Sequence, residues 1–167
     1  MKELRAGAAL TGFVLSIIGA NWALARWGIV PIGFGLYAPA GVYFAGLAFT
    51  MRDGVRETLG KRGVVVAIAV GAGLSYLLED AQTFAIASGV AFAFSETADA
   101  IVYEPLRSRS WLAAVSLSNT VGVFVDSALF LWLAFGSLAF IEGQIVGKLY
   151  MTAAAILVVA IWKGRSK

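Results

Sequence analysis

Six long apolar stretches take up most of this chain of 167 residues. Each approaches the roughly 20 residues that a helix needs to cross a bilayer. Because lipid offers no hydrogen-bond partners, the backbone groups of such stretches must be satisfied within helices. The stretches lie at about 7–25, 31–50, 63–79, 82–102, 111–135 and 143–162. The sequence therefore predicts an all-α, polytopic membrane protein: a single domain over residues 1–167, built as a bundle of six transmembrane helices.

The composition supports this class and removes several others. Hydrophobic residues make up 60% of the chain and charged residues 14%, and the mean hydropathy is +0.84, far from the balance of a soluble domain. Cysteine and histidine are both absent, which excludes disulfides, zinc sites built from those ligands and haem held by an axial histidine. We therefore expect no cofactor and no bound metal.

The basic residues predict the orientation of the chain. If the amino terminus is cytoplasmic, the outer connections hold Arg26 alone, and Lys148 falls within a span. The remaining basic residues all fall on the cytoplasmic side: Lys2, Arg5, Arg52, Arg56, Lys61, Arg62, Arg107, Arg109, Lys163, Arg165 and Lys167. This split is a strong positive-inside signal and agrees with an even number of spans. We expect a multi-pass protein of the cell (inner) membrane with both termini cytoplasmic, and no nucleic-acid partner in spite of a sequence pI near 9.4.

The first stretch has a second interpretation. Lys2 and Arg5, an apolar run and the small residues around Ala23 and Ala25 resemble a signal peptide with its cleavage site. The run is longer than a usual signal core, however, and the charges downstream already fit a cytoplasmic start. A retained first span is the interpretation that these observations favour.

Acidic residues lie inside the apolar stretches. Glu96 and Asp99 are three positions apart on neighbouring parts of one helical face, and Asp126 lies seven positions after Asn119, almost two turns. A carboxylate at membrane depth is costly and usually faces a bundle interior or a water-filled cavity. We expect these carboxylates to converge on one shared, hydrated pocket.

Depths along the helices, taken from the rise per residue, sort the polar residues into two layers. The inner layer holds Glu96, Asp99 and Asn119. The outer layer holds Asp126 with Gln144 and Lys148, which are four positions apart and share a helical face. Such a ladder of polar groups could carry a polar solute across the membrane.

Each of these side chains also has a structural interpretation. Asp99 could be solvated near the headgroups, Lys148 could extend outward and pair with Glu142, and Asn119 could hold two helices together. The charged run from Arg52 to Glu57 is typical of a solvated helical face. Glu96 and Asp126 could also form a purely stabilising pair network.

Several motifs resemble those of one membrane-protein family. Residues 39–47 with Arg52, Asp53 and Glu57 resemble the second helix of the VUT family, which is named for vitamin uptake transport. The stretches 94–103, 118–127 and 143–148 are similar to motifs of its fourth, fifth and sixth helices. The resemblance covers about residues 33–150, with the polar motifs in order and on separate helices.

The resemblance implies a function and a set of contacts. It implies uptake of queuosine precursors, the 7-deazaguanines that carry a cyano or an aminomethyl group. It also implies contacts with this purine-like substrate from the matching polar residues: Glu96, Asp99, Asn119, Asp126, Gln144 and Lys148. Apart from the family, a guanine-like edge offers two N–H donors that one carboxylate can accept together, and an aromatic such as Phe92 or Trp132 could stack on the ring.

Other functions remain open at this stage. Transport could be proton-coupled through a buried carboxylate, or the chain could be the substrate-binding subunit of a vitamin importer driven by an ATPase partner, since it contains no phosphate-binding Gly-Lys-Ser/Thr loop. It could also form a homo-oligomer. An intramembrane enzyme that uses Glu96 and Asp99 as acid and base, or to hold a metal, is disfavoured, because no nucleophile–base pair is present. We therefore expect a transporter and not an enzyme.

Overall fold

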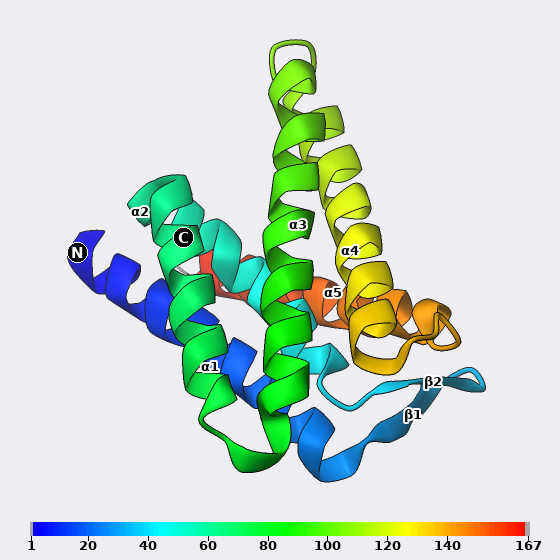
Figure 1. The fold of residues 1–167 in the computed structure, drawn as a ribbon. Helices are drawn as coiled ribbons and strands as arrows, with labels where there is room; N and C mark the ends of the chain where they lie inside the picture. The colour runs from blue at the N-terminus through cyan, green and yellow to red at the C-terminus, as the bar shows by residue number, and fades with distance from the viewer. Residues whose placement is uncertain (1, 166–167) are drawn as a thin grey trace.

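The protein is mostly helical. The computed structural model describes residues 2–165, of which the helices are α1 (Lys2–Trp27), α2 (Val42–Tyr76), the 3-10 turn η1 (Glu79–Ala81), α3 (Gln82–Leu106), α4 (Trp111–Phe135) and α5 (Ile141–Arg165). Figure 1 shows their order along the chain. Within the described residues, four helices are long and apolar enough to cross a membrane: α1, α2, α3 and α4. The predicted class of helical membrane protein is thus supported.

The predicted count of six helices is not confirmed, because the single helix α2 includes parts of two predicted spans, 31–50 and 63–79. It runs from Val42 to Tyr76, and its direction changes at Gly60, where the backbone leaves helical geometry with φ 72° and ψ −176°. Glycine adopts positive φ at little cost, so the two limbs of α2 fold back as an angled pair (Figure 1). The break lies in the basic segment that the sequence placed between the second and third spans.

The start of the second predicted span, from Pro31, is wrong. Residues Ile29–Gly33 (β1) and Leu36–Pro39 (β2) form an antiparallel hairpin in which Pro31 pairs with Tyr37. The turn uses positive φ at Gly33, Phe34 and Gly35, which continuing a helix would not allow. The helix therefore begins only at Val42. The hairpin follows the last turn of α1, and β2 packs against α5 (Figure 1).

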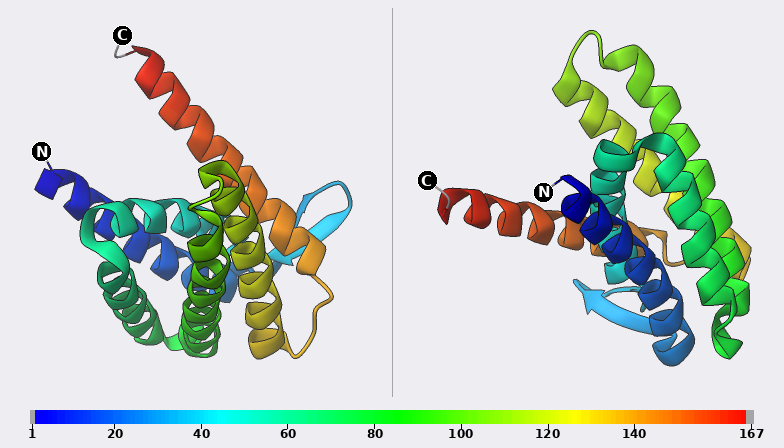
Figure 2. Two further views of the ribbon diagram at one scale, coloured as in Figure 1. Left: turned by 90° about the horizontal axis from the view of Figure 1, so that it is seen from above. Right: turned by 90° about the vertical axis from the view of Figure 1, so that its left-hand side faces the viewer.

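The helices pack in two close pairs and one crossing helix. Helix α1 packs along α2, α3 packs along α4, and α5 crosses α2. Figure 2 shows α3 and α4 standing together while α5 extends away from them. The start of α1, the bend in α2 and the α3–α4 turn lie toward one end, and the hairpin, η1 and the α4–α5 connection lie toward the other (Figure 1).

The basic residues follow this division. Arg26 is in the last turn of α1, beside the hairpin, whereas Lys61 and Arg62 follow the α2 bend and Arg107 and Arg109 lie at the α3–α4 turn. The two ends thus differ in the number of these basic residues, and the orientation of the termini stays a prediction. Lys167, also predicted to be cytoplasmic, lies outside the described residues.

An aromatic core joins the first three helices. The ring of Phe92 in α3 lies 5.4 Å from that of Phe13 in α1 and 4.9 Å from that of Phe49 in α2, between ring centroids. All three side chains are buried, together with Ile17 and Ile68. This cluster fixes the helices around the polar residues described below.

Close packing of α1 against α2 depends on Gly41, and this gives a first prediction. A Cβ atom at Gly41 would overlap the backbone carbonyl of Ala20, and membrane helices use small residues to approach in this way. We expect Gly41→Ala to destabilise the folded protein by about 1–3 kcal/mol, the cost of overpacking. Thermal unfolding of the purified protein in detergent measures this change.

Gly73→Ala is the matched control for this substitution. Gly73 lies in the second limb of α2 with nothing within 4 Å of an added Cβ, so alanine there should be neutral or stabilising. Equal melting temperatures for the two variants would contradict the packing described for Gly41.

Candidate functional site

A buried ion pair joins α4 to α5. Lys148 Nζ donates to Asp126 Oδ2 at 2.6 Å and to Ser127 Oγ at 2.7 Å. Lys148 is 1% exposed and Asp126 5%, so both charges are removed from solvent. Gln144, one turn before Lys148, is 2% exposed. We call these four residues the Asp126 group.

Local sequence explains how a lysine comes to lie so deep. Gly46 of α2 faces the backbone of Lys148, where a Cβ would lie 2.9 Å from the Lys148 carbonyl oxygen, and Gly147 of α5 faces the side chain of Val42. The backbones of α2 and α5 therefore approach closely at Gly46, as small residues in membrane helices permit. The Lys148 side chain is directed from this contact toward α4.

A second set of buried charges joins α2 to α3. Arg52 Nη1 lies 3.1 Å from Glu96 Oε2, and Arg56 Nη2 lies 2.8 Å from Glu96 Oε1. Arg56 Nη1 also donates to Asp99 Oδ2 at 2.8 Å. Arg52 and Asp99 are each 1% exposed and Glu96 is 9% exposed. One carboxylate thus lies between two guanidinium groups.

Arg52 extends this set to α4. Its Nη2 donates to Asp53 Oδ1 at 2.8 Å and to Asn119 Oδ1 at 3.2 Å. The set therefore holds two guanidinium groups, three carboxylates and one amide, and it ties three helices together. We call these six residues the Arg52 network: Arg52, Asp53, Arg56, Glu96, Asp99 and Asn119.

The Phe49 ring lies between the two sets of charges. The guanidinium carbon of Arg52 is 5.2 Å from the ring centroid, and Lys148 Nζ is 5.8 Å from it. Both distances are within the range of cation–π attraction. One rigid side chain of α2 therefore contacts a cation of each set.

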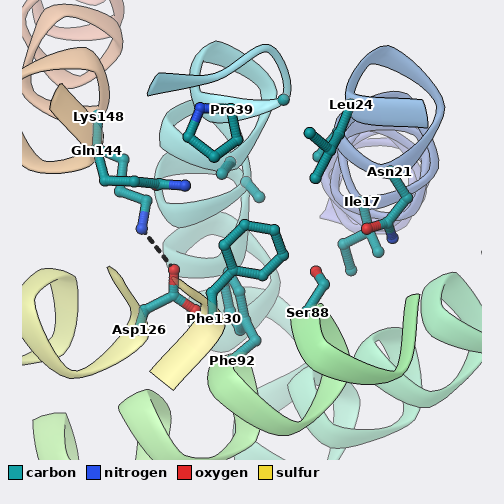
Figure 3. Close-up of a pocket in the computed structure, with 14 residues that line it drawn as sticks. Ile17, Asn21, Leu24, Pro39, Ser88, Phe92, Asp126, Phe130, Gln144 and Lys148 are labelled. Carbon is teal, nitrogen blue, oxygen red and sulfur yellow. Dashed lines mark hydrogen bonds and ion pairs between the residues drawn. The ribbon is translucent and has the colours of Figure 1, made fainter. Parts of the chain in front are cut away.

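A narrow cavity lies beside the Asp126 group. It is lined from all five long helices, with Asp126, Gln144 and Lys148 on one side and Asn21 and Ser88 across from them (Figure 3). Phe92 and Phe130 lie between these sides. Its volume is about 30 Å³, room for a few water molecules at about 10–15 Å³ each. A bicyclic solute therefore requires the helices to separate.

The six predicted substrate contacts fall into the two predicted layers. Asp126, Gln144 and Lys148 lie together at the cavity, whereas Glu96, Asp99 and Asn119 belong to the Arg52 network. Asp99 and Asn119 also line an open crevice of about 560 Å³ near the α3–α4 turn. The shared pocket expected for Glu96 and Asp126 is not formed: Glu96 is not among the described residues that line the cavity.

Several structural interpretations are also decided. Lys148 pairs with Asp126 and not with Glu142, Asp99 is buried and not solvated, and Asn119 does join two helices, through Arg52. The predicted solvated face from Arg52 to Glu57 is wrong for Arg52. The helix continues to the bend at Gly60, so Arg52 lies inside the bundle, where Glu96 compensates its charge.

Sequence reasoning missed two residues of the cavity and the two arginines of the network. Asn21 is a lone amide in the first apolar stretch, and Ser88 lies early in the fourth. An uncharged polar residue at membrane depth is a weak signal, because helix–helix hydrogen bonds explain most of them. Among the described residues no cluster of three potential metal-ligating side chains forms, and the Glu96 and Asp99 carboxylates contact guanidinium groups instead.

The fold and the site together define a polytopic membrane protein with a polar interior. A family model described as "Putative vitamin uptake transporter" matches residues 74–163, more than half of the chain. The protein belongs to this family. The match includes all six predicted contacts and leaves out the 39–57 motif. No curated protein and no solved structure matches the chain.

The Asp126–Lys148 pair gives a second prediction. We expect Lys148→Met to destabilise the protein by about 3–5 kcal/mol, because the Asp126 charge then remains buried without its partner. The double variant with Asp126→Asn as well should recover most of this loss, because it leaves no unpaired charge. Thermal unfolding of the two single variants and the double variant in detergent measures the coupling.

Lys61→Met is the control for this cycle. Lys61 pairs with Glu104 at 2.9 Å, but both side chains are largely exposed, so the loss should stay below about 1 kcal/mol. A double variant that is as unstable as the sum of its two single variants would show that the buried pair is not coupled.

Proposed function

We propose that this protein imports a queuosine precursor, a 7-deazaguanine, across the inner membrane. One observation carries the proposal: buried hydrogen-bonding side chains, Asn21, Asp126, Gln144 and Lys148, line a cavity at the meeting point of five helices. Intramembrane charges of this kind mark substrate pathways. The function follows from the family membership, and the deazaguanine substrate is the specific part of the proposal.

The cavity offers groups that suit a guanine-like ring. Asp126 can accept two N–H donors from the guanine edge, and a carboxylate makes such paired contacts well. Lys148 and the Gln144 amide supply donors for the ring carbonyl. Phe92 and Phe130 supply apolar faces for stacking, whereas Trp132, the other aromatic considered from sequence, is 61% exposed.

The Arg52 network then has the role of an inner barrier. Its guanidinium and carboxylate groups are paired with one another, and they occupy the end of the bundle near the α2 bend and the α3–α4 turn. We assign this end to the cytoplasmic side, because Lys61, Arg62, Arg107 and Arg109 lie there. A solute leaving the cavity inward would meet Glu96, Asp99 and Asn119 as these pairs separate.

The uptake experiment is the third prediction. Labelled 7-cyano-7-deazaguanine is supplied to cells that cannot synthesise it, with and without this protein. Uptake should require the protein and should fall at least about tenfold in Asp126→Asn, because the carboxylate that accepts the guanine N–H donors is lost. Glu96→Gln should also reduce uptake, because the inner layer loses its shared carboxylate.

Glu104→Gln is the control for both variants. Glu104 forms an exposed pair with Lys61, so its loss should leave uptake unchanged once the amounts of protein in the membrane are matched. Full uptake in both Asp126→Asn and Glu96→Gln would count decisively against the proposal.

The energy source is the subject of the fourth prediction. We propose proton coupling through a buried carboxylate, so that a protonophore abolishes accumulation and uptake is faster at an external pH of about 5 than at about 8. Purified protein in liposomes with an imposed pH gradient gives the direct measurement. Uptake that does not depend on the pH gradient but requires ATP and a copurifying ATPase would identify the protein as the substrate-binding subunit of an ATP-driven importer.

A further inference from the structure

Asn21 is a buried amide with an unused donor. It lies in α1, it is 1% exposed, and its Nδ2 has no hydrogen-bond partner among the described residues. The α1 residues around it that line the same cavity, Ile17, Ala20 and Leu24, are apolar. An unsatisfied buried donor costs about 1–3 kcal/mol, so packing alone does not account for this side chain.

Gln144 presents the complementary group across the cavity. It is 2% exposed, and its Oε1 has no hydrogen-bond partner among the described residues. Figure 3 shows Asn21 on one side of the cavity and Gln144, with Lys148, on the other. The cavity therefore contains an open donor and an open acceptor that are separated from each other.

The cavity is also electrically neutral. Among the residues described as lining it, the charged side chains are Asp126 and Lys148, and these two form an ion pair at 2.6 Å. A charged ligand placed there would need a counter-charge of its own, because an unpaired ion in a low-dielectric site is strongly disfavoured. Displacing Lys148 from Asp126 would only leave the lysine charge buried and unpaired.

We propose that Asn21 and Gln144 are ligand-contacting residues that select a neutral nitrogen heterocycle. Asn21 donates to an acceptor on the ligand, and Gln144 accepts from an N–H of the ligand. This inference rests on the proposed function and sharpens it. The aminomethyl compound carries a cationic amine, as a lysine does at neutral pH, and the described residues that line the cavity offer no free counter-charge for it. Of the two deazaguanines, the neutral cyano compound is therefore the ligand.

The test is equilibrium binding to the purified full chain in detergent. The probes are 7-cyano-7-deazaguanine, 7-aminomethyl-7-deazaguanine and hypoxanthine, a neutral ring with the same type of amide edge. Wild-type protein should bind the cyano compound at least about tenfold more tightly than the aminomethyl compound. Asn21→Ala should weaken binding of the cyano compound about tenfold, the loss of one buried hydrogen bond.

Ser16→Ala is the matched control. Ser16 is buried in the same helix, and its hydroxyl donates to the Phe13 carbonyl oxygen at 2.7 Å, away from the cavity. The Ser16→Ala variant should therefore bind the cyano compound as tightly as the wild type does. The melting temperature without ligand is the second readout. Asn21→Ala should leave it unchanged or raise it, because the amide nitrogen has no partner to lose among the described residues and its burial is costly. A large fall would instead assign Asn21 a structural role and overturn the proposal.

The binding outcomes separate this inference from the proposed function. Equal affinity of Asn21→Ala and wild type for the cyano compound would overturn the inference and leave deazaguanine uptake standing. Tighter binding of the aminomethyl compound would overturn the selection for neutral ligands. If hypoxanthine alone bound, and its binding depended on Asn21, the inference would be supported and the proposal of a deazaguanine substrate would be overturned. No binding of any probe would overturn both.

Discussion

A charge inside a membrane protein must have its partner inside as well, and this requirement shapes the whole structure. Lys148 can lie at the centre of the bundle only because Asp126 meets it there at 2.6 Å, and Arg52 only because Glu96 and Asp53 do. The Lys148–Asp126 contact connects α5 with α4, and the Arg52–Glu96 contact connects α2 with α3. Since unpaired charges in the interior are so costly, these contacts fix which helices are neighbours.

Stability alone does not explain why the charges are present. Buried ion pairs can often be replaced by apolar residues of similar size without loss of stability, and most of this chain is apolar already. The pairs are also not scattered: they occupy two depths, and one of them borders a cavity that contains an unused donor at Asn21 and an unused acceptor at Gln144. Positions that break the rules of a stable core in this way are expected at functional sites.

The helical class and the grouping of the polar residues could be predicted from the sequence, because both depend on local spacing, whereas the count of six helices is not confirmed. Apolar stretches locate the helices, and the rise per residue places Asp126 and Lys148 within about one helical turn of each other in depth. The hairpin at 29–39 was missed, because Pro31 is also a favourable first residue of a helix and the turn depends on three successive positive φ values. Arg52 was misplaced for a similar reason: its burial depends on α2 continuing to Gly60, and only the fold shows that Glu96 lies opposite it.

The position of Phe49 connects the two layers mechanically. Its ring contacts both the Arg52 guanidinium and the Lys148 ammonium, and its centroid lies 4.9 Å from that of Phe92, which lines the cavity. A shift of α2 that displaced the Phe49 ring would therefore change the surroundings of both cations and of Phe92, whose side chain lines a cavity too small for a bicyclic solute. A transporter needs such a link, because a barrier that opened independently of the binding cavity would leak.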